Sequence, residues 1–233
     1  MKMRWAQTMP ASAYALAISS SSEIDGAANE LARIRDDYQV TGVAAAGARE
    51  RIIKSWERCR AMRVDPRAKE PLIRRDPEEL RCTNELLLRA SDPILTLLAD
   101  ALADTGYLVV LADASGHVLH VAGELRARLS SADAGIVPGA DFSEASAGTN
   151  AVGTAIADRR ALQLLAGEHF CDVAQDLTCT AAPIYLPEGR EIAGVLALSG
   201  NYRLVRSQLI DVAMQGALDV EDQLGASLRS APE

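Results

Sequence analysis

Residues 107–121 have the sequence YLVVLADASGHVLHV, and this stretch decides the fold. The apolar run 107–111 is typical of a buried strand, and 117–121 alternates polar and apolar side chains as a half-buried strand does. Between them, the sequence from Asp113 to Gly116 favours a tight turn. The stretch therefore predicts an antiparallel β-hairpin.

A second hairpin is predicted nearer the C-terminal end. Residues 179–185 and 192–199 are largely apolar, and Pro187 and Gly189 between them supply the geometry of a turn. Neither hairpin loop has room for the crossover helix that parallel strands require. Two antiparallel hairpins with helices between and around them indicate an α+β fold with a central, mainly antiparallel sheet flanked by helices.

Helical and strand patterns follow both hairpins. Residues 148–157 (GTNAVGTAIA) predict a helix that Thr149 or Asn150 can cap, and residues 161–165 predict a short strand after it. After the second hairpin, residues 204–228 predict a long amphipathic C-terminal helix.

A further helix is predicted just before the first hairpin. Asp92 can cap it, Pro93 suits its first position, and Gly106 lies where the chain must turn to end it. The leucines at 86–88 predict a helical segment that leads into it.

The upstream residues divide into two parts. Residues 1–45 are rich in Ala and Ser, with a short helical pattern around 27–38, and they predict a flexible N-terminal arm. Residues 46–83 predict a helical extension, and residues 84–228 form the main domain. The helical extension carries a stripe of apolar residues spaced four and three apart, namely Ile52, Trp56 and Cys59. We expect this stripe and the C-terminal helix to meet their counterparts in a two-fold homodimer.

Composition limits the classes of partner. Apolar residues make up 48% of the 233 positions, so a packed core is expected, and the net charge is −8. Recognition of nucleic acid needs clustered Lys and Arg, whereas the basic region 49–81 is interleaved with acids. We therefore expect no direct binding of nucleic acid.

The cysteines and apolar runs indicate a cytoplasmic protein. The four cysteines form no C-x-x-C pair, so reduced thiols are expected. The apolar run 11–18 superficially resembles a secretion signal, but polar residues and Pro10 interrupt the region. No run is long enough to cross a membrane, and no membrane association is expected.

Five sequence blocks follow one another between Phe142 and Gly200. They are SE at 143–144, GTNAVGTA at 148–155, GEHF at 167–170, CTAAPI at 179–184 and GVLALSG at 194–200. The series resembles the sensory GAF domain of the acetoin- and dihydroxyacetone-type catabolic activators, which work with the alternative sigma factor of bacteria. The likeness covers about residues 48–227, because SWERC at 55–59 and DP at 65–66 are similar to the helix that precedes that domain.

The resemblance implies a GAF sensory domain over residues 84–228 that regulates transcription of a catabolic operon and is not an enzyme. Full-length activators of this kind carry an ATPase module and a DNA-binding helix-turn-helix after the GAF domain, and this sequence ends at Glu233 before either. We expect either an isolated sensory piece or a natural stand-alone relative that acts through a partner. The family also often has an acid where this sequence has Ala197.

The segments 141–155 and 167–171 are predicted to close over a small polar effector. Glycines permit close backbone approach, polar side chains at a helix N-terminus can donate to an oxygen, and aromatic rings supply apolar walls. The predicted ligand-binding residues are Phe142, Glu144, Thr149, Asn150, Thr154, Glu168, His169, Phe170 and Cys179. The alternative is that Thr149 and Asn150 only cap the helix and the glycines only shape turns.

His169 has three interpretations: a ligand contact, a metal or haem ligand, or a structural group satisfied by hydrogen bonds. Glu168, His169, Cys171 and Cys179 lack a recognised metal-binding spacing, and no metal or cofactor is expected.

Two other functions compete with a sensor that binds its effector without turnover. One is a protein-interaction module with no small ligand. The other is a cysteine-based redox enzyme like the free methionine sulfoxide reductases built on GAF domains, using Cys171 and Cys179. Neighbouring acids would raise the pKa of such a thiol, which disfavours the enzyme.

Overall fold

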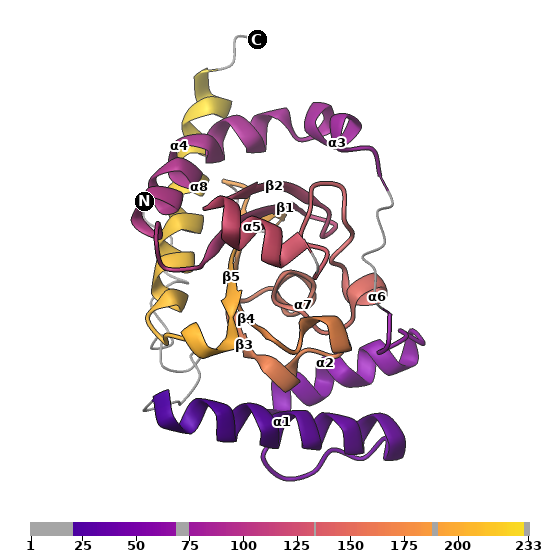
Figure 1. Ribbon diagram of the computed structural model, residues 1–233. Helices are drawn as coiled ribbons and strands as arrows, with labels where there is room; N and C mark the ends of the chain where they lie inside the picture. The colour runs from indigo at the N-terminus through magenta and orange to yellow at the C-terminus, as the bar shows by residue number, and fades with distance from the viewer. Residues whose placement is uncertain (1–20, 69–74, 133, 188–190, 231–233) are drawn as a thin grey trace.

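The computed structural model describes residues 21–68, 75–132, 134–187 and 191–230 (Figure 1). These residues contain one antiparallel sheet in the order β2-β1-β5-β4-β3. Its strands are β1 (Leu108–Asp113), β2 (Val118–Ala122), β3 (Leu162–Leu165), β4 (Leu177–Tyr185) and β5 (Ile192–Asn201). The predicted hairpins are β1–β2 and β4–β5, and pairing of β1 with β5 joins them into one sheet. The α+β prediction is confirmed.

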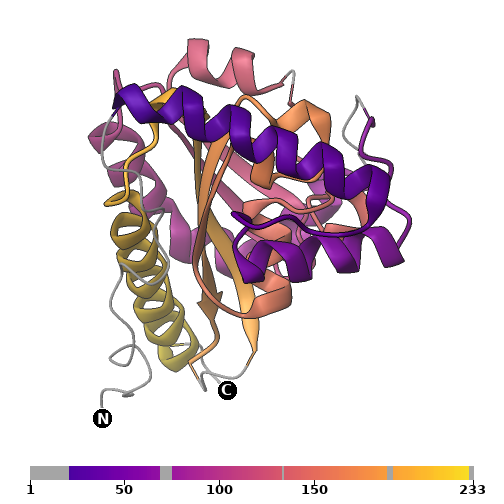
Figure 2. The same ribbon diagram turned by 90° about the horizontal axis from the view of Figure 1, so that it is seen from below.

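Helices cover both faces of this sheet. Helices α4 (Glu85–Ala101) and α8 (Leu209–Ser230) pack on one face, and α7 (Ala151–Asp158) packs on the other. Figure 2 shows α4 and α8 on one side of the strands and α2 (Glu50–Ala61) on the opposite side. Shorter helices are α3 (Pro77–Thr83), α5 (Leu125–Ala132) and α6 (Glu144–Ala147), with 3-10 turns η3 (Ala166–Glu168), η4 (Asp172–Ala174) and η5 (Tyr202–Leu204).

The sheet separates two apolar cores because successive strand residues point to opposite faces. Val109 and Leu111 face the core under α4 and α8, whereas Leu108 and Val110 face the core on the α7 side. The candidate site lies within this second core.

The N-terminal segment differs from the predicted arm. Residues 21–41 form the helix α1 (Ser21–Thr41), with Ile34 and Tyr38 buried, and the Tyr38 and Trp56 rings lie 5.2 Å apart between centroids. The helix lies across the bottom of the molecule in Figure 1, against α2 and η3. The segment is mostly polar, so its narrow apolar face was not recognised in the sequence. Packing of that face against the rest of the chain stabilises the helix. The rest of the predicted arm, residues 1–20, lies outside the described residues.

The apolar stripe of α2 lies inside the chain. Ile52, Trp56 and Cys59 are almost completely buried, and the buried apolar residues of α8 pack against the sheet and α4. The expectation that the α2 stripe meets its counterpart in a dimer is therefore wrong, because its own chain already covers it, whereas the expected meeting of the C-terminal helices stays a prediction. A homodimer remains a prediction without the α2 contact.

Helix α4 begins earlier than Asp92 and Pro93 predicted. It starts at Glu85, and Pro93 lies inside it on the exposed side. Proline removes one helix hydrogen bond, but a continuous apolar face runs past it and packs on the sheet, which offsets that loss. Gly106 does adopt a left-handed conformation (φ +79°) between α4 and β1. Among the described residues, no helix combines the length and apolarity needed to span a bilayer.

Candidate functional site

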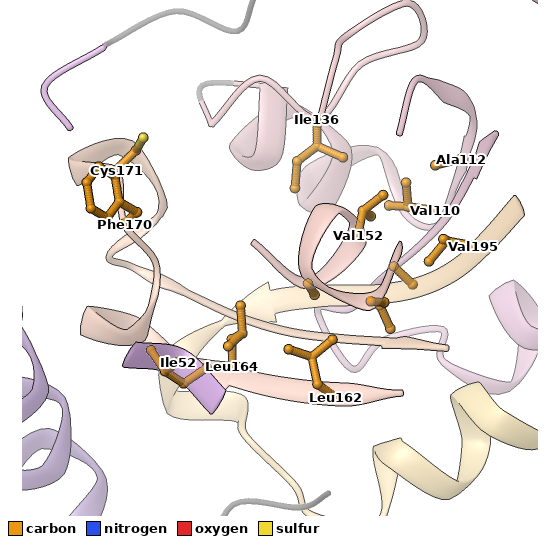
Figure 3. Packing of buried hydrophobic residues seen from close by; sticks show 14 of the residues in the cluster. Ile52, Val110, Ala112, Ile136, Val152, Leu162, Leu164, Phe170, Cys171 and Val195 are labelled. Carbon is orange, nitrogen blue, oxygen red and sulfur yellow. The ribbon is translucent and has the colours of Figure 1, made fainter. Parts of the chain in front are cut away.

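A cavity of about 70 Å³ lies between the sheet and the segments that cover its α7 face. At roughly 10–15 Å³ per water-sized atom, it holds on the order of five non-hydrogen atoms. Its walls include Val110, Val118, Ile136, Asp141, Phe142, Asn150, Val152, His169, Cys171, Cys179, Ala197 and Ser199. Figure 3 shows Val110 on β1, Val152 on α7 and Ile136 gathered in this part of the core. The walls are mostly apolar, so the few polar groups decide what the cavity can bind.

His169 is a wall residue of the cavity, and its ring has one unused acceptor. Its Nδ1 lies 3.0 Å from the carbonyl oxygen of Ala166. A carbonyl only accepts, so Nδ1 carries the proton and Nε2 has the lone pair. Nε2 is buried and has no hydrogen-bond partner among the described residues. Burial lowers the pKa of His169 to about 4, so the ring is neutral at physiological pH.

The other polar wall groups are already paired. The Cys179 Sγ and Ser199 Oγ atoms lie 3.2 Å apart, and burial raises the pKa of Cys179 to about 11. The Asp141 carboxylate accepts from Ser143 N at 2.9 Å and Ser146 Oγ at 2.5 Å. Burial alone would raise the pKa of Asp141, but these hydrogen bonds outweigh it and the pKa is lowered. Asp141 therefore adds a negative charge at the cavity wall.

Four of the nine predicted ligand-binding residues line the cavity: Phe142, Asn150, His169 and Cys179. The Asn150 amide is occupied, because its Nδ2 donates to the carbonyl oxygens of Phe142 and Gly148 and its Oδ1 accepts from Gly153 N at 2.9 Å. Asn150 is thus the cap of α7, as the structural alternative predicted.

Glu144, Thr149 and Thr154 form a buried network that does not reach the cavity. Glu144 Oε1 accepts from Ser55 Oγ at 2.5 Å and from Thr154 Oγ1 at 2.9 Å, and its carboxylate pairs with Arg58 at 2.6 Å. The hydroxyls of Thr149 and Ser55 lie 2.7 Å apart. This network ties α2 to α6 and α7, so these polar atoms have internal partners.

Glu168 and Phe170 also lie away from the cavity. The Glu168 carboxylate pairs with Arg49 at 2.6 Å and accepts from Leu165 N at 2.9 Å. Phe170 packs in the core against Gly148, where an added Cβ would lie 2.8 Å from the Phe170 Cβ (Figure 3 shows the ring). Both residues flank His169, and they shape the loop that carries it.

Apart from Cys179 on β4, the sequence interpretation missed the sheet residues of the cavity. Val110 and Ala197 are partners across the β1–β5 pairing and share one face, and Ser199 lies two residues beyond Ala197 on the same face. The period-two pattern of the strands could have identified them. Ala197 contributes no charge to this wall.

The described part of the chain contains no group of three or more His, Cys, Asp or Glu placed to hold a metal ion. The cysteines of the described residues are free thiols, and burial raises the pKa of Cys59 to about 11 and that of Cys171 to about 12.

The antiparallel sheet with helices on both faces, enclosing a small cavity, defines a GAF-like sensory domain. Residues 27–222 match the family described as "MimR, N-terminal domain". The chain belongs to this family of regulatory N-terminal domains, and the relatives that it matches include transcriptional activators of catabolic operons.

Two curated relatives illustrate the match. The propane 2-monooxygenase operon transcriptional activator MimR of Mycolicibacterium smegmatis is 31% identical over 194 residues, covering 82% of this chain and 33% of that protein. The acetoin dehydrogenase operon transcriptional activator AcoR of Bacillus subtilis is 28% identical over 187 residues, covering 79% and 31%. The chain thus spans about a third of the length of these two relatives.

A solved structure shares the fold. In the Escherichia coli DhaR(N)–DhaL complex, one chain superposes with a TM-score of 0.73 at 19% identity, covering 78% of this chain and 62% of that chain. At this identity the likeness concerns the fold alone.

Proposed function

We propose that the chain senses a small, uncharged metabolite that binds in the cavity without turnover and controls transcription of a catabolic operon. The observation that carries this proposal is that His169 lines the cavity and that its buried Nε2 has no hydrogen-bond partner among the described residues. A buried acceptor without a partner costs about 1–3 kcal/mol, which a ligand that donates a hydrogen bond would recover.

The polarity of the wall groups supports a neutral ligand with a hydroxyl group. Nε2 in this tautomer can only accept, so the ligand must supply the proton. An anion would meet the Asp141 carboxylate and, among the described wall residues, no Lys or Arg. Burial of an unpaired charge is costly, which disfavours carboxylates and phosphates.

Binding without turnover is supported by the state of the thiols. A raised pKa keeps Cys171 and Cys179 protonated at neutral pH, whereas catalytic cysteines need a thiolate. The alternative of a cysteine-based reductase therefore has less support than a binding role.

A matched set of four-carbon compounds tests the proposal. Thermal shift and calorimetry compare 2-butanol, butanone and butyrate, together with short diols and hydroxyketones. We expect a hydroxyl compound to raise the melting temperature of the wild type, because a ligand that binds only the folded state stabilises it. The shift should be lost in His169→Leu.

His120→Leu is the control, because Leu111, its partner on β1, faces the core under α4 and α8, away from the cavity. This variant should bind like the wild type. Equal binding by the His169 variant would contradict the role of Nε2, and no binding of any compound would contradict the sensor itself.

A protein partner is the second candidate for the signal. It is favoured by the fold neighbour, which was solved as a complex of DhaR(N) with DhaL. An ATPase and DNA-binding module, as part of the same protein or as another subunit, would be the receiver of either signal.

A further inference from the structure

The direction of His169 Nε2 depends on one backbone turn, residues 165–169. Ala166 has φ +41°, in the left-handed region that L residues rarely adopt, and its carbonyl oxygen accepts from both His169 N and His169 Nδ1 at 3.0 Å. This carbonyl therefore fixes both the tautomer and the orientation of the ring. A rarely populated conformation persists only where its surroundings hold it.

Glu168 holds this turn from inside. Its side chain is almost completely buried, and Oε2 accepts from Leu165 N at 2.9 Å, closing the turn on itself. Trp56 Nε1 donates to the Glu168 carbonyl oxygen at 3.0 Å. Glu168 does not line the cavity, so its charge serves the turn and not the ligand.

Arg49 supplies the charge that this buried carboxylate requires. Its Nε and Nη2 donate to the two Glu168 oxygens at 2.6 and 2.7 Å, and Nη2 also donates to Gln163 O at 2.6 Å. A bidentate pair of this kind fixes geometry as well as charge. Arg49 immediately precedes α2, and no other residue in the described chain forms a salt bridge with Glu168.

We propose that Arg49 is a positioning residue of the effector cavity: through Glu168 it holds the turn that fixes the orientation and tautomer of the His169 ring in the cavity wall. The N-terminal helical layer is thereby part of the sensing site, and not merely an extension that precedes it. The proposal rests on the proposed function for its purpose, but the positioning itself can be measured without any ligand.

The chain contains a matched control two residues away. Arg51 also ties α2 to the main domain, pairing with Asp158 at 2.6 Å and donating to the carbonyl oxygens of Ala161 and Arg160. Its side chain is 24% exposed, compared with 32% for Arg49. The hydrogen bonds and ion pair of Arg51 go to Asp158, Arg160 and Ala161 and not to residues 165–169, so an Arg51 variant reports the general effect of losing a contact between α2 and the main domain.

The experiment is long-range ¹H–¹⁵N NMR of the full chain labelled at histidine. The sequence has three histidines, so His→Gln variants assign the signals. In the wild type we expect His169 to show the Nδ1–H tautomer. In Arg49→Met we expect that signature to be replaced by averaged or Nε2–H signals, whereas Arg51→Met should retain it.

An unchanged His169 spectrum in folded Arg49→Met would overturn the proposal, and so would an equal change in Arg51→Met. If Arg49→Met does not fold, Arg49→Lys decides: a single ammonium cannot reproduce the bidentate pair, so an intermediate spectrum supports the proposal and a wild-type spectrum overturns it.

This outcome is separable from that of the proposed function. If Arg49→Met changes the His169 spectrum as expected but no compound binds, the sensor proposal is wrong and the positioning role of Arg49 stands. If ligand binding depends on His169 but not on Arg49, the sensor proposal stands and the positioning role is wrong.

Discussion

The thiols of Cys171 and Cys179 lie at the cavity wall, and burial raises their pKa to about 12 and about 11. Because the thiolate is the reactive form, both should react slowly with a disulfide reagent in the folded protein at neutral pH. Cys82 is exposed and should react fast. We expect one fast thiol in a native reagent assay, and all four only after unfolding.

The control for this assay is Cys82→Ser, which should remove the fast phase alone. A second fast thiol that disappears in Cys179→Ser would contradict the assignment and would favour the redox enzyme.

Glu221 on α8 makes stability depend on pH. Burial raises its pKa to about 7 from 4.5, although its carboxylate accepts from Tyr185 N at 2.8 Å. Between pH 4.5 and about 7, the Glu221 carboxyl is therefore protonated in the folded state and ionised in the unfolded state. Linkage then requires this contribution to be present below pH 4.5 and to be lost as the pH rises through about 7.

Urea unfolding of the wild type and Glu221→Gln at about pH 5 and about pH 8 measures this contribution. We expect the variant to lose less stability than the wild type as the pH rises. His169 has the opposite effect, because its lowered pKa costs stability as the pH falls below 6.5. Both proteins contain His169, so its effect cancels when the variant is compared with the wild type. Parallel curves for the two proteins would show that Glu221 ionises normally.

The sequence predicted poorly which polar residues face the cavity. Thr149 and Asn150 are neighbours, but Asn150 has an extended backbone (φ −148°), which sends adjacent side chains in different directions. Thr149 consequently points to Ser55, and Asn150 points to Phe142. Such a difference depends on tertiary packing, which a sequence motif does not contain.

At the level of elements, the strands and helix α2 were predictable and helix α1 was not. Both hairpins follow from apolar runs and turn residues, which are local signals. Helix α1 is stabilised by contacts with η3 and α2, far along the sequence, so its short apolar pattern alone indicated an arm. The same reasoning explains why α4 continues through Pro93.

The contact of α1 with η3 gives a prediction about this element. A Cβ added at Gly167 would lie 2.3 Å from Ala32 N and 2.4 Å from Leu31 C, which are backbone atoms of α1. Gly167→Ala should force α1 off the turn and cost about 1–3 kcal/mol of unfolding free energy, as overpacking typically does. Hydrogen exchange of α1 amides should rise in this variant.

Gly26→Ala is the matched control in α1, because a Cβ there meets nothing within 4 Å. It should stabilise the protein by about 0.5–1 kcal/mol through higher helix propensity. Gly167→Ala with unchanged stability and unchanged exchange would show that α1 is not held against the turn.

At the scale of the molecule, the N-terminal helices and the sheet form one unit. The family match runs from residue 27, inside α1, to residue 222, inside α8. Helices α1 and α2 close one side of the unit, and Arg49, Ser55 and Trp56 contact the segments that border the cavity. We therefore propose that the sensory domain begins at α1 and not near residue 84.

The proposed recognition of the effector depends on a hydrogen bond that the effector donates to His169. The most direct test titrates the histidine-labelled chain with the hydroxyl compound that gives the largest thermal shift, and follows the three ¹⁵N ε2 signals. Accepting a hydrogen bond should move the His169 Nε2 resonance in proportion to occupancy, with His117 and His120 unchanged. Saturation of the protein while His169 Nε2 stays fixed would contradict the account.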